Sequence, residues 1–241
     1  LADAVVVRGS AHVPIAESWG ARRVVVIPDG VDPAWFARRD ATDLRRRLGI
    51  EGRITVGVVS TIGVEAASGL PSPGWDVVET LARLPDLPLV GLIVGDGPGM
   101  PALRALAGRR GVSARLVMPG RVPLAALPDY LSALDVFLHT ALNNRMSAVR
   151  TTGKLPLLLA SGCAAVVSRV GEAARVLEGT GMLLDFDGTA DDYAAALASR
   201  VRELVAGGQL ERWRESGPAI ARREFDYAVL GERASALLRT L

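Results

Sequence analysis

Short apolar runs alternate with helical segments along most of this chain, and this alternation limits the folds open to it. The expected strands are residues 54–59, 87–94, 114–118, 136–138, 164–167 and 182–184, and the expected helices between and after them are 75–83, 101–110, 124–134 and 190–206. Alternating β and α units of this length are typical of a parallel sheet with helices on both faces. We therefore predict an α/β fold with a doubly wound, Rossmann-like parallel sheet, whose ligands bind beyond the carboxyl ends of the strands.

The composition excludes several other classes of protein. Hydrophobic residues make up 49% and charged residues 22% of the 241-residue chain, as in ordinary globular domains and unlike disordered chains. The 28 basic residues are nearly balanced by 26 acidic ones and only 5% of residues are aromatic, so no nucleic-acid partner is indicated. The longest apolar run, 155–167, is too short to span a bilayer. No transmembrane segment is expected, and a peripheral contact with a membrane surface stays open.

The cysteine and histidine content gives no sign of a metal site. Cys163 is the single cysteine, so no intramolecular disulfide can form, and its place before an apolar run predicts a small buried residue rather than a nucleophile. His12 and His139 have no cysteine or carboxylate neighbours at metal-ligand spacing. We expect a cytoplasmic protein that uses neither a metal nor another cofactor.

The two ends of the chain differ from its middle. Residues 1–28 predict one βαβ unit, with strands near 4–7 and 23–27, and such a unit cannot cover both faces of its own strands. Residues 29–40 open with two aspartates, a glycine and a proline and predict a linker. Residues 41–216 hold the main domain, and 217–241 predict one amphipathic packing helix. With neither an initiator methionine nor a signal-peptide pattern before the first strand, we expect a piece of a longer protein.

One segment, RTTGKLPLLLASGCAAVVSRVGEA at 150–173, has the most detailed pattern. It predicts a loop, a short helix from about Lys154, a turn at Gly162, a buried strand, and a further helix starting at Gly171. Lys154 is the only lysine of the chain, so the other 27 of the 28 basic residues are arginines. It is either a residue left by chance on a solvated turn or a phosphate ligand ahead of a helix N-terminus.

A glycine-rich turn, GDGPG at 95–99, lies between an expected strand and an expected helix. In such a context glycines let a ligand approach backbone N–H groups. The run is not Gly-x-Gly-x-x-Gly, because Met100 departs from that pattern, and no acidic residue ends a strand about 20 residues later. The sequence therefore gives no dinucleotide-binding fingerprint.

Four segments taken together are more specific than any one of them. They are IPDGVDPAWF (27–36), GWDVVETLARLPDLPLVGLIVGDGPG (74–99), LVMPGRVPLAALPDYLSALDVFLHT (116–140) and the 150–173 segment. In this order and spacing they resemble the C-terminal half of the retaining GT-B glycosyltransferases of family 4, also called group 1. The resemblance implies that this half binds a nucleotide-diphosphate sugar, linked to UDP or GDP. It also implies that residues 1–28 are the last part of an acceptor-binding domain to which the final helix crosses back.

Single residues can be carried over from the motifs of that family. The resemblance places Arg121, Val122 and Leu127 beside the base of the donor, and Lys154 with Arg150 near its diphosphate. Cations suit the second place, because a diphosphate leaving group gains charge as the glycosidic bond breaks. For Arg150 a surface cation on a loop is the equal alternative.

Two further positions have both a functional and a structural interpretation. Gly63 follows the first strand of the main domain, where the backbone either faces the donor or forms an ordinary turn. Asn144 either binds sugar hydroxyls or caps a turn, as does Asn143.

The chain also departs from the family at positions that bind the donor. Residues 60–63 and 72–73 lack the Arg and Lys that family members carry there, and Val149 and Leu157 replace a pair of glutamates. Two interpretations follow. In one, the full-length protein is a hexosyltransferase that acts with retention on an unidentified acceptor, and this chain alone is inactive because the acceptor site lies outside it. In the other, the chain is a non-catalytic relative that serves as a binding or scaffold module.

Overall fold

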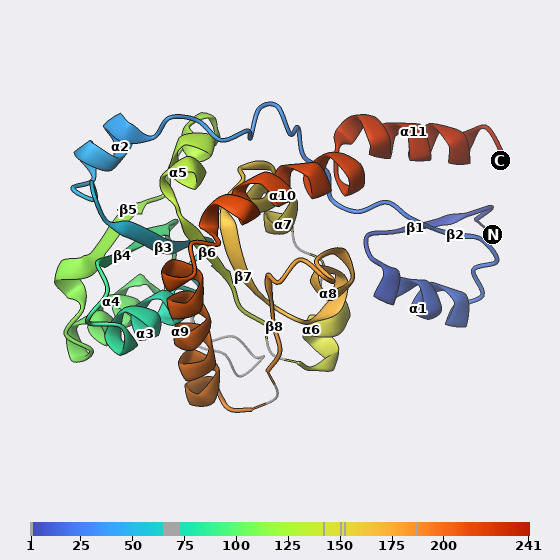
Figure 1. Ribbon diagram of the computed structural model, residues 1–241. Helices are drawn as coiled ribbons and strands as arrows, with labels where there is room; N and C mark the ends of the chain where they lie inside the picture. Colours follow the sequence, from blue (N-terminus) through green and yellow to red (C-terminus); the bar gives the residue numbers. More distant parts are fainter. Residues whose placement is uncertain (1, 65–72, 142, 150, 152, 187) are drawn as a thin grey trace.

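The computed structural model describes residues 2–241 except for 65–72, 142, 150, 152 and 187 (Figure 1). Within these residues the main sheet has six strands, all paired in parallel, in the order β5-β4-β3-β6-β7-β8. The strands are β3 (Ile54–Val59), β4 (Leu89–Val94), β5 (Leu116–Gly120), β6 (Val136–His139), β7 (Ala164–Ser168) and β8 (Leu183–Leu184). The sheet is parallel and doubly wound, as the sequence predicted. The direction of winding reverses between β3 and β6.

Helices cover both faces of the main sheet (Figure 1). On one face α3 packs against α4 and α9, and on the other α10 packs against α7 and β7, with α2 and α5 in contact beside them. Their bounds are α2 (Thr42–Arg47), α3 (Trp75–Arg83), α4 (Met100–Arg109), α5 (Leu127–Ala133), α7 (Lys154–Ala160), α8 (Gly171–Val176), α9 (Ala190–Ala206) and α10 (Leu210–Glu224).

The core lies between these layers. Every residue of β4 and β7 is buried, which explains why neither strand alternates between apolar and polar residues. In α9 the buried positions Tyr193, Leu197 and Val201 recur at helical spacing, and the helix begins with a reciprocal cap between Thr189 and Asp192. Helix and sheet thus bury the residues that the apolar periodicity selects.

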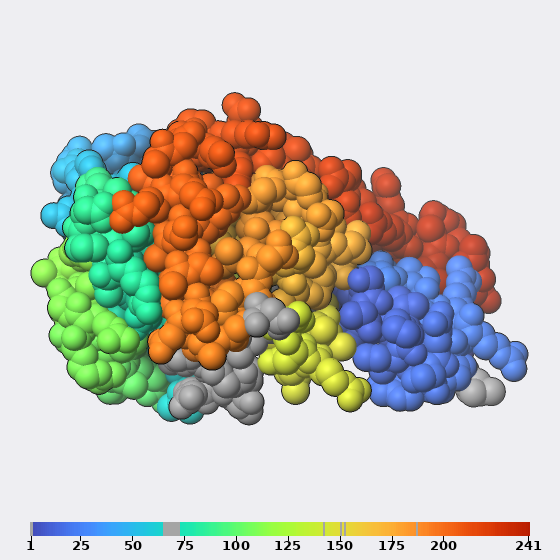
Figure 2. All heavy atoms as spheres, turned by 60° about the horizontal axis from the view of Figure 1, so that its bottom comes forward, coloured from blue at the N-terminus to red at the C-terminus, as the bar shows by residue number. Residues whose placement is uncertain are grey.

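A second, two-stranded parallel sheet lies beside the first. It consists of β1 (Val5–Val7) and β2 (Val24–Val26), joined by a short 3₁₀ turn and α1 (Val13–Ser18). Figure 2 shows these blue residues as a lobe against the yellow residues of α6 (Arg145–Val149). The last helix, α11 (Tyr227–Leu238), returns to this sheet, where the guanidinium of Arg23 donates to the carbonyl and hydroxyl of Thr240.

The outgoing and returning segments of the chain cross at one place between the two sheets. The N–H of Val31 donates to the carbonyl of Phe225 (2.8 Å), and the N–H of Tyr227 donates to the carbonyl of Val31 (3.1 Å). Gly30 lies under the ring of Tyr227, so close that an added Cβ would stand 2.4 Å from it. The crossing falls inside the expected linker, while the expected domain limits stay predictions.

Some boundaries differ from those expected. The segment 217–241 is not one helix, because Asp226 accepts the N–H of Ala228 (2.8 Å) and caps a new helix there. β5 begins at Leu116, since Ser113–Arg115 form a 3₁₀ turn. Helix α6 was not expected at all.

The expectation for the single cysteine is confirmed. Cys163 is fully buried, and desolvation raises the pKa of its thiol to about 12, which keeps the sulfur protonated and unreactive. No helix in the described part of the chain is both long and apolar enough to cross a bilayer.

Candidate functional site

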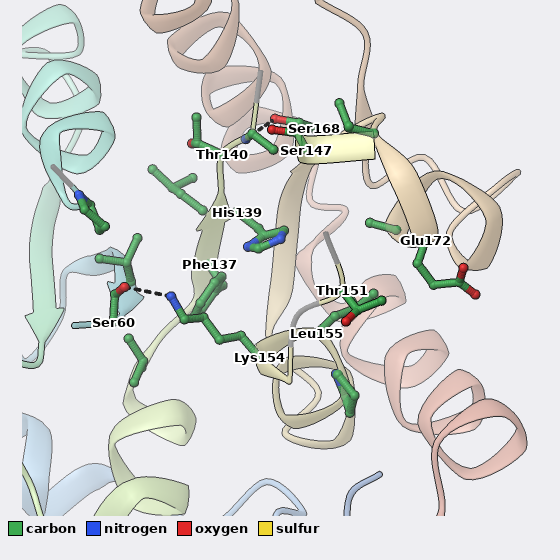
Figure 3. A pocket seen from close by; sticks show the side chains of 18 of the residues that line it. Ser60, Phe137, His139, Thr140, Ser147, Thr151, Lys154, Leu155, Ser168 and Glu172 are labelled. Atoms are coloured by element: carbon green, nitrogen blue, oxygen red, sulfur yellow. Dashed lines mark hydrogen bonds between the residues drawn. The ribbon is translucent and has the colours of Figure 1, made fainter. Parts of the chain in front are cut away.

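A cavity of about 380 Å³ opens where the winding of the main sheet reverses. Ser60, which follows β3, and His139 and Thr140, which end β6, form its central walls (Figure 3). Lys154 of α7 and Glu172 of α8 close other sides. In open parallel sheets ligands bind at this point, because the loops after the two neighbouring strands run to opposite faces.

Lys154 is the first residue of α7, and its side chain reaches across the cavity to the end of β3. The Nζ atom donates to the Oγ atom of Ser60 at 2.7 Å (Figure 3). The helix is held in this register by its buried face, which comprises Leu155, Pro156, Leu158, Leu159 and Ala160. Burial of the apolar face therefore places the one lysine of the chain at the cavity.

A carboxyl group and three hydroxyl groups form two hydrogen-bonded pairs beside the cavity. The hydroxyl of Thr140 donates to Oδ2 of Asp76 (2.7 Å). The hydroxyls of Ser168 and Tyr193 share a hydrogen bond of 2.9 Å, and the N–H of Ala141 donates to the Ser168 Oγ (2.9 Å). The network ties the ends of β6 and β7 to α3 and α9.

Burial sets the protonation behaviour of this network. Asp76 is 3% exposed, and desolvation raises its pKa against the opposing effect of hydrogen bonds from Thr140 and backbone N–H groups. Desolvation likewise raises the pKa of Tyr193 to about 12. These groups therefore act as positioned hydrogen-bonding groups rather than as solvated charges.

The small sheet supplies the outer wall of the cavity. Arg8, just after β1, forms an ion pair with Asp29, and both residues line the cavity. The N–H and hydroxyl of Ser10 donate to one oxygen of Glu172 (2.9 and 2.8 Å), while Arg175 binds the other. Burial raises the pKa of Glu172, but the hydrogen bonds from Ser10 and Arg175 outweigh it, so the pKa is lowered overall. The charged carboxylate fixes the small sheet to α8.

Lys154 is the residue, among those expected to bind the donor and described in the structure, that lines the cavity. Arg121 and Val122 follow β5, on the same edge of the sheet but beyond β4, and Leu127 begins α5. Gly63 lies in the loop that follows β3. None of these four is among the lining residues. Their contact with the base or backbone of a donor stays a prediction.

The remaining expected positions have different outcomes. The Oδ1 atom of Asn144 accepts the N–H of Ser147 at 2.9 Å, so this side chain caps α6, as its structural interpretation proposed. Arg150 lies outside the described residues. Leu157 is half-buried, packs against the core and is not among the cavity-lining residues. Across the described ranges no three His, Cys, Asp or Glu side chains gather as a metal site requires.

Several cavity residues were not selected from the sequence as ligands. Ser60, Thr140 and Ser168 are small polar residues at the ends of apolar strands, and that position is the signal by which they could have been found. Asp76 gave no such signal, because an aspartate in a first helical turn ordinarily serves the helix itself.

Comparison with known proteins places the chain in a family. A model of the family described as glycosyl transferases group 1 matches residues 76–206, more than half of the chain. The chain belongs to this family. The matched part of this group 1 member runs from Asp76 to the end of α9, and it includes the walls that β6, α7 and β7 give to the cavity.

Two curated Streptomyces proteins are similar to this group 1 chain. The 2-deoxystreptamine glucosyltransferase of Streptomyces kanamyceticus is 32% identical over 213 residues, which is 82% of this chain and 52% of the relative. The 2-deoxystreptamine N-acetyl-D-glucosaminyltransferase of Streptomyces fradiae is 33% identical over 122 residues, 48% of this chain and 27% of the relative. The chain thus spans about half the length of the first relative, and the match to the second covers 27% of that relative.

Solved structures of other glycosyltransferases share the fold. Anabaena HepE in complex with UDP-glucose superposes with a TM-score of 0.79 at 19% identity, covering 100% of this chain and 65% of HepE. A glycosyltransferase from Rickettsia africae gives a TM-score of 0.75 at 12% identity, covering 98% of this chain and 62% of that one. This group 1 chain therefore has the Rossmann-like C-terminal fold of the GT-B glycosyltransferases, as expected.

Proposed function

We propose that the cavity between β3 and β6 binds the nucleotide-diphosphate sugar donor of a glycosyltransferase, with Lys154 at the diphosphate. The observation that carries this proposal is the place of Lys154 at the winding reversal, with its Nζ atom 2.7 Å from Ser60. An ammonium group is a compact cation that binds phosphate oxygens well. It also stabilises the charge that develops on a departing diphosphate.

The relatives support the choice of ligand. HepE was crystallised with UDP, with UDP and glucose, and with UDP-glucose. The two Streptomyces relatives are named for glucosyl and N-acetylglucosaminyl transfer. UDP-glucose and UDP-N-acetylglucosamine are therefore the first donors to test, with GDP-sugars as the alternative. In this proposal Arg121, Val122 and Leu127 border the base, while Gly63 and Arg150 make further contacts.

For the whole protein we propose hexosyl transfer with retention to an acceptor that is not identified. The bond between the anomeric carbon and the diphosphate breaks, and the acceptor oxygen bonds to the same carbon while its proton is released. Lys154 stabilises the diphosphate as it leaves. In this proposal the residues that bind the acceptor lie outside this chain, so we expect residues 1–241 alone to transfer no sugar. We expect the whole protein to work in the cytoplasm.

A second candidate function is a non-catalytic binding or scaffold module with the same fold. The position of Leu157 favours it, because this side chain packs on the core where family members place a ribose-binding glutamate. The two candidates differ in whether the cavity takes a nucleotide.

Calorimetric titration of the chain with UDP, GDP, UMP and uridine distinguishes them. If the cavity is a donor site, a diphosphate should bind at least about tenfold more tightly than the nucleoside, since one charged hydrogen bond contributes about 1.5 to 3 kcal/mol. UDP and GDP together show which base is preferred. Absence of binding by both diphosphates would reject the donor site and leave the scaffold function.

A further inference from the structure

We propose that Ser60 is a positioning residue, which holds the Lys154 ammonium where it meets the donor diphosphate. The inference rests on the proposed function, because it assigns a role to a neighbour of the proposed diphosphate ligand. Ser60 follows β3 and Lys154 begins α7, so their hydrogen bond spans the cavity across the winding reversal (Figure 3).

The direction of the hydrogen bonds at Ser60 is determined by their chemistry. An ammonium group can only donate, so the Ser60 Oγ is the acceptor from Lys154 at 2.7 Å. The single hydroxyl proton of Ser60 is then directed to the carbonyl of Thr61 at 3.0 Å. The Ser60 hydroxyl engages one of the three N–H groups of the ammonium. Because the hydroxyl is uncharged, it does not neutralise the ammonium, whereas a carboxylate would.

The loop that carries Ser60 is held from behind by the glycine-rich turn after β4. The N–H of Ser60 donates to the carbonyl of Val94 (2.9 Å), and the N–H of Ile62 donates to the carbonyl of Asp96 (3.0 Å). In the other direction the N–H of Gly99 donates to the carbonyl of Ile62 (2.9 Å). These three hydrogen bonds, one to the last residue of β4 and two to the turn after it, make the position of Ser60 a fixed one.

The glycines in that turn are required by this contact. Gly95 has φ of +137°, and an added Cβ would lie 1.8 Å from the Ser60 carbonyl oxygen. Gly97 has φ of +152°, and its Cβ would lie 2.4 Å from the carbonyl oxygen of Ile62. The turn is thus shaped to receive the loop after β3. It supports the cation instead of surrounding a phosphate itself.

Positioning matters for this particular side chain. A lysine has a long flexible stem, and ordering it on ligand binding costs entropy. A hydrogen bond to a fixed acceptor orders the ammonium before the ligand arrives, so less entropy is lost on binding.

The single lysine makes the arrangement directly observable. Protein labelled with ¹³C and ¹⁵N in lysine alone gives one set of side-chain resonances, all from Lys154. In Ser60→Ala we expect the ε-carbon and ε-proton shifts to change and the side-chain order to fall, while Ser60→Thr, which keeps the hydroxyl, restores them. Ser235→Ala, an exposed serine in α11, is the matched control and should leave the spectrum unchanged. A Lys154 signal that is the same in Ser60→Ala and wild type overturns the inference, whether or not a nucleotide binds.

Titrations with UDP and uridine test the consequence for binding. Ser60→Ala should weaken UDP about 2- to 10-fold, the effect of one ordinary hydrogen bond, and leave uridine unchanged. In a Lys154→Ala background the same substitution should have no further effect. An equal loss in both backgrounds would mean that Ser60 acts on the ligand or the fold directly and would overturn the inference. Failure of wild type to bind either UDP or GDP would reject the proposed function, while the lysine spectrum would still decide the positioning role.

Discussion

Two polar clusters lie at opposite ends of the same pair of strands, β3 and β6, and they are built differently. At the amino ends, Asp135 accepts the N–H and hydroxyl of Thr55 (both 2.9 Å) and pairs with Arg45 (3.2 Å) and Arg214 (2.7 Å), with Arg38 at 3.9 Å. At the carboxyl ends, Asp76 accepts the hydroxyl of Thr140, and the connected groups are hydroxyls that border a cavity.

The two clusters differ in whether their polar groups are bonded only within the protein or also face the cavity. Around Asp135 the guanidinium groups also donate to backbone carbonyls, those of Leu134 from Arg38 and Ala133 from Arg45. Cations, carboxylate and backbone carbonyls are thus bonded to one another, apart from the buried Nε of Arg214, and the cluster fastens α2 and α10 to the sheet. At the carboxyl ends the polar groups face a space that can hold a ligand. One end of the strand pair stabilises the fold, and the other is arranged for binding.

The largest effect should come from the amino-end cluster. Asp135→Ala leaves the arginines without their shared carboxylate, whose side chain is 12% exposed, and should lower the free energy of unfolding by about 3 to 5 kcal/mol. Asp43→Ala, which removes a carboxylate that is 86% exposed and paired with Arg46, should cost less than about 1 kcal/mol. Urea unfolding of both variants makes the measurement. Similar losses would show that the Asp135 cluster is no more than a surface ion pair.

Substitution of Lys154 should give the opposite pattern. Lys154→Ala should weaken UDP by about 1.5 to 3 kcal/mol, the range for a charged hydrogen bond, with little change in unfolding free energy. Arg104→Ala, an exposed cation on α4, should change neither quantity. Calorimetry and urea unfolding on the same samples test both parts. A Lys154→Ala protein that binds UDP like the wild type would return this lysine to a solvated turn.

Leu157 tests where the ligand cavity stops and the core begins. Because this side chain packs against the core, Leu157→Glu should lower the free energy of unfolding by about 1 to 3 kcal/mol, the cost of burying a polar group without a partner. Leu157→Met keeps the apolar volume and should cost less than about 1.5 kcal/mol. Melting temperature and UDP affinity are measured for both. Tighter UDP binding by Leu157→Glu at an unchanged melting temperature would instead extend the donor site to this position.

The smallest effect is the pH dependence from Asp76. Burial raises its pKa above the ordinary value of 3.8, so the native state keeps a proton that the unfolded chain loses. Its contribution to stability is therefore greatest below pH 3.8 and declines as the pH rises through the raised pKa, by at most about 1.4 kcal/mol per pH unit. Urea unfolding of wild type and Asp76→Asn at a series of pH values gives the free energy of unfolding as a function of pH. In Asp76→Asn this decline should be absent.

Asp86 provides the control of opposite sign. Its hydrogen bond with Arg202 lowers the pKa to about 2, so its contribution is present above pH 3.8 and is lost as the pH falls toward 2. Asp86→Asn should therefore flatten the acid side of the curve only. If Asp76→Asn flattened the same side, the assignment of a raised pKa to Asp76 would be wrong.

The apolar patterns of the sequence predicted the limits of several strands and helices correctly. Residues 54–59, 75–83 and 190–206 were expected with the limits that the structure has. The final helix was misjudged, because the cap at Asp226 is one side-chain contact within a continuous amphipathic pattern. Local patterns thus give the strands and long helices, but single contacts set where neighbouring helices divide.

For the site the limit is of another kind. Lys154 could be selected because it is unique in the sequence, and the structure places it at the cavity. Ser60 and Thr140 are ordinary residues until it is known that β3 and β6 are neighbours with diverging loops. That pairing depends on which strands meet across the sheet, and a chain order of strands and helices does not specify it.

The crossing at Val31 and Asp226 has a mechanical consequence. The outgoing segment at Val31 and the returning segment at Asp226 are joined by a parallel β-bridge. The two sheets are therefore connected by two chain segments that are bonded to each other, and not by one linker alone. Both segments hold the small sheet in place, with the ring of Tyr227 packed on Gly30, and the hydrogen bonds from Ser10 to Glu172 add a third connection. The outer wall of the cavity, which carries Arg8 and Asp29, moves with the small sheet. The width of the cavity between this outer wall and the inner walls on β3 and β6 therefore depends on where the crossing holds the small sheet.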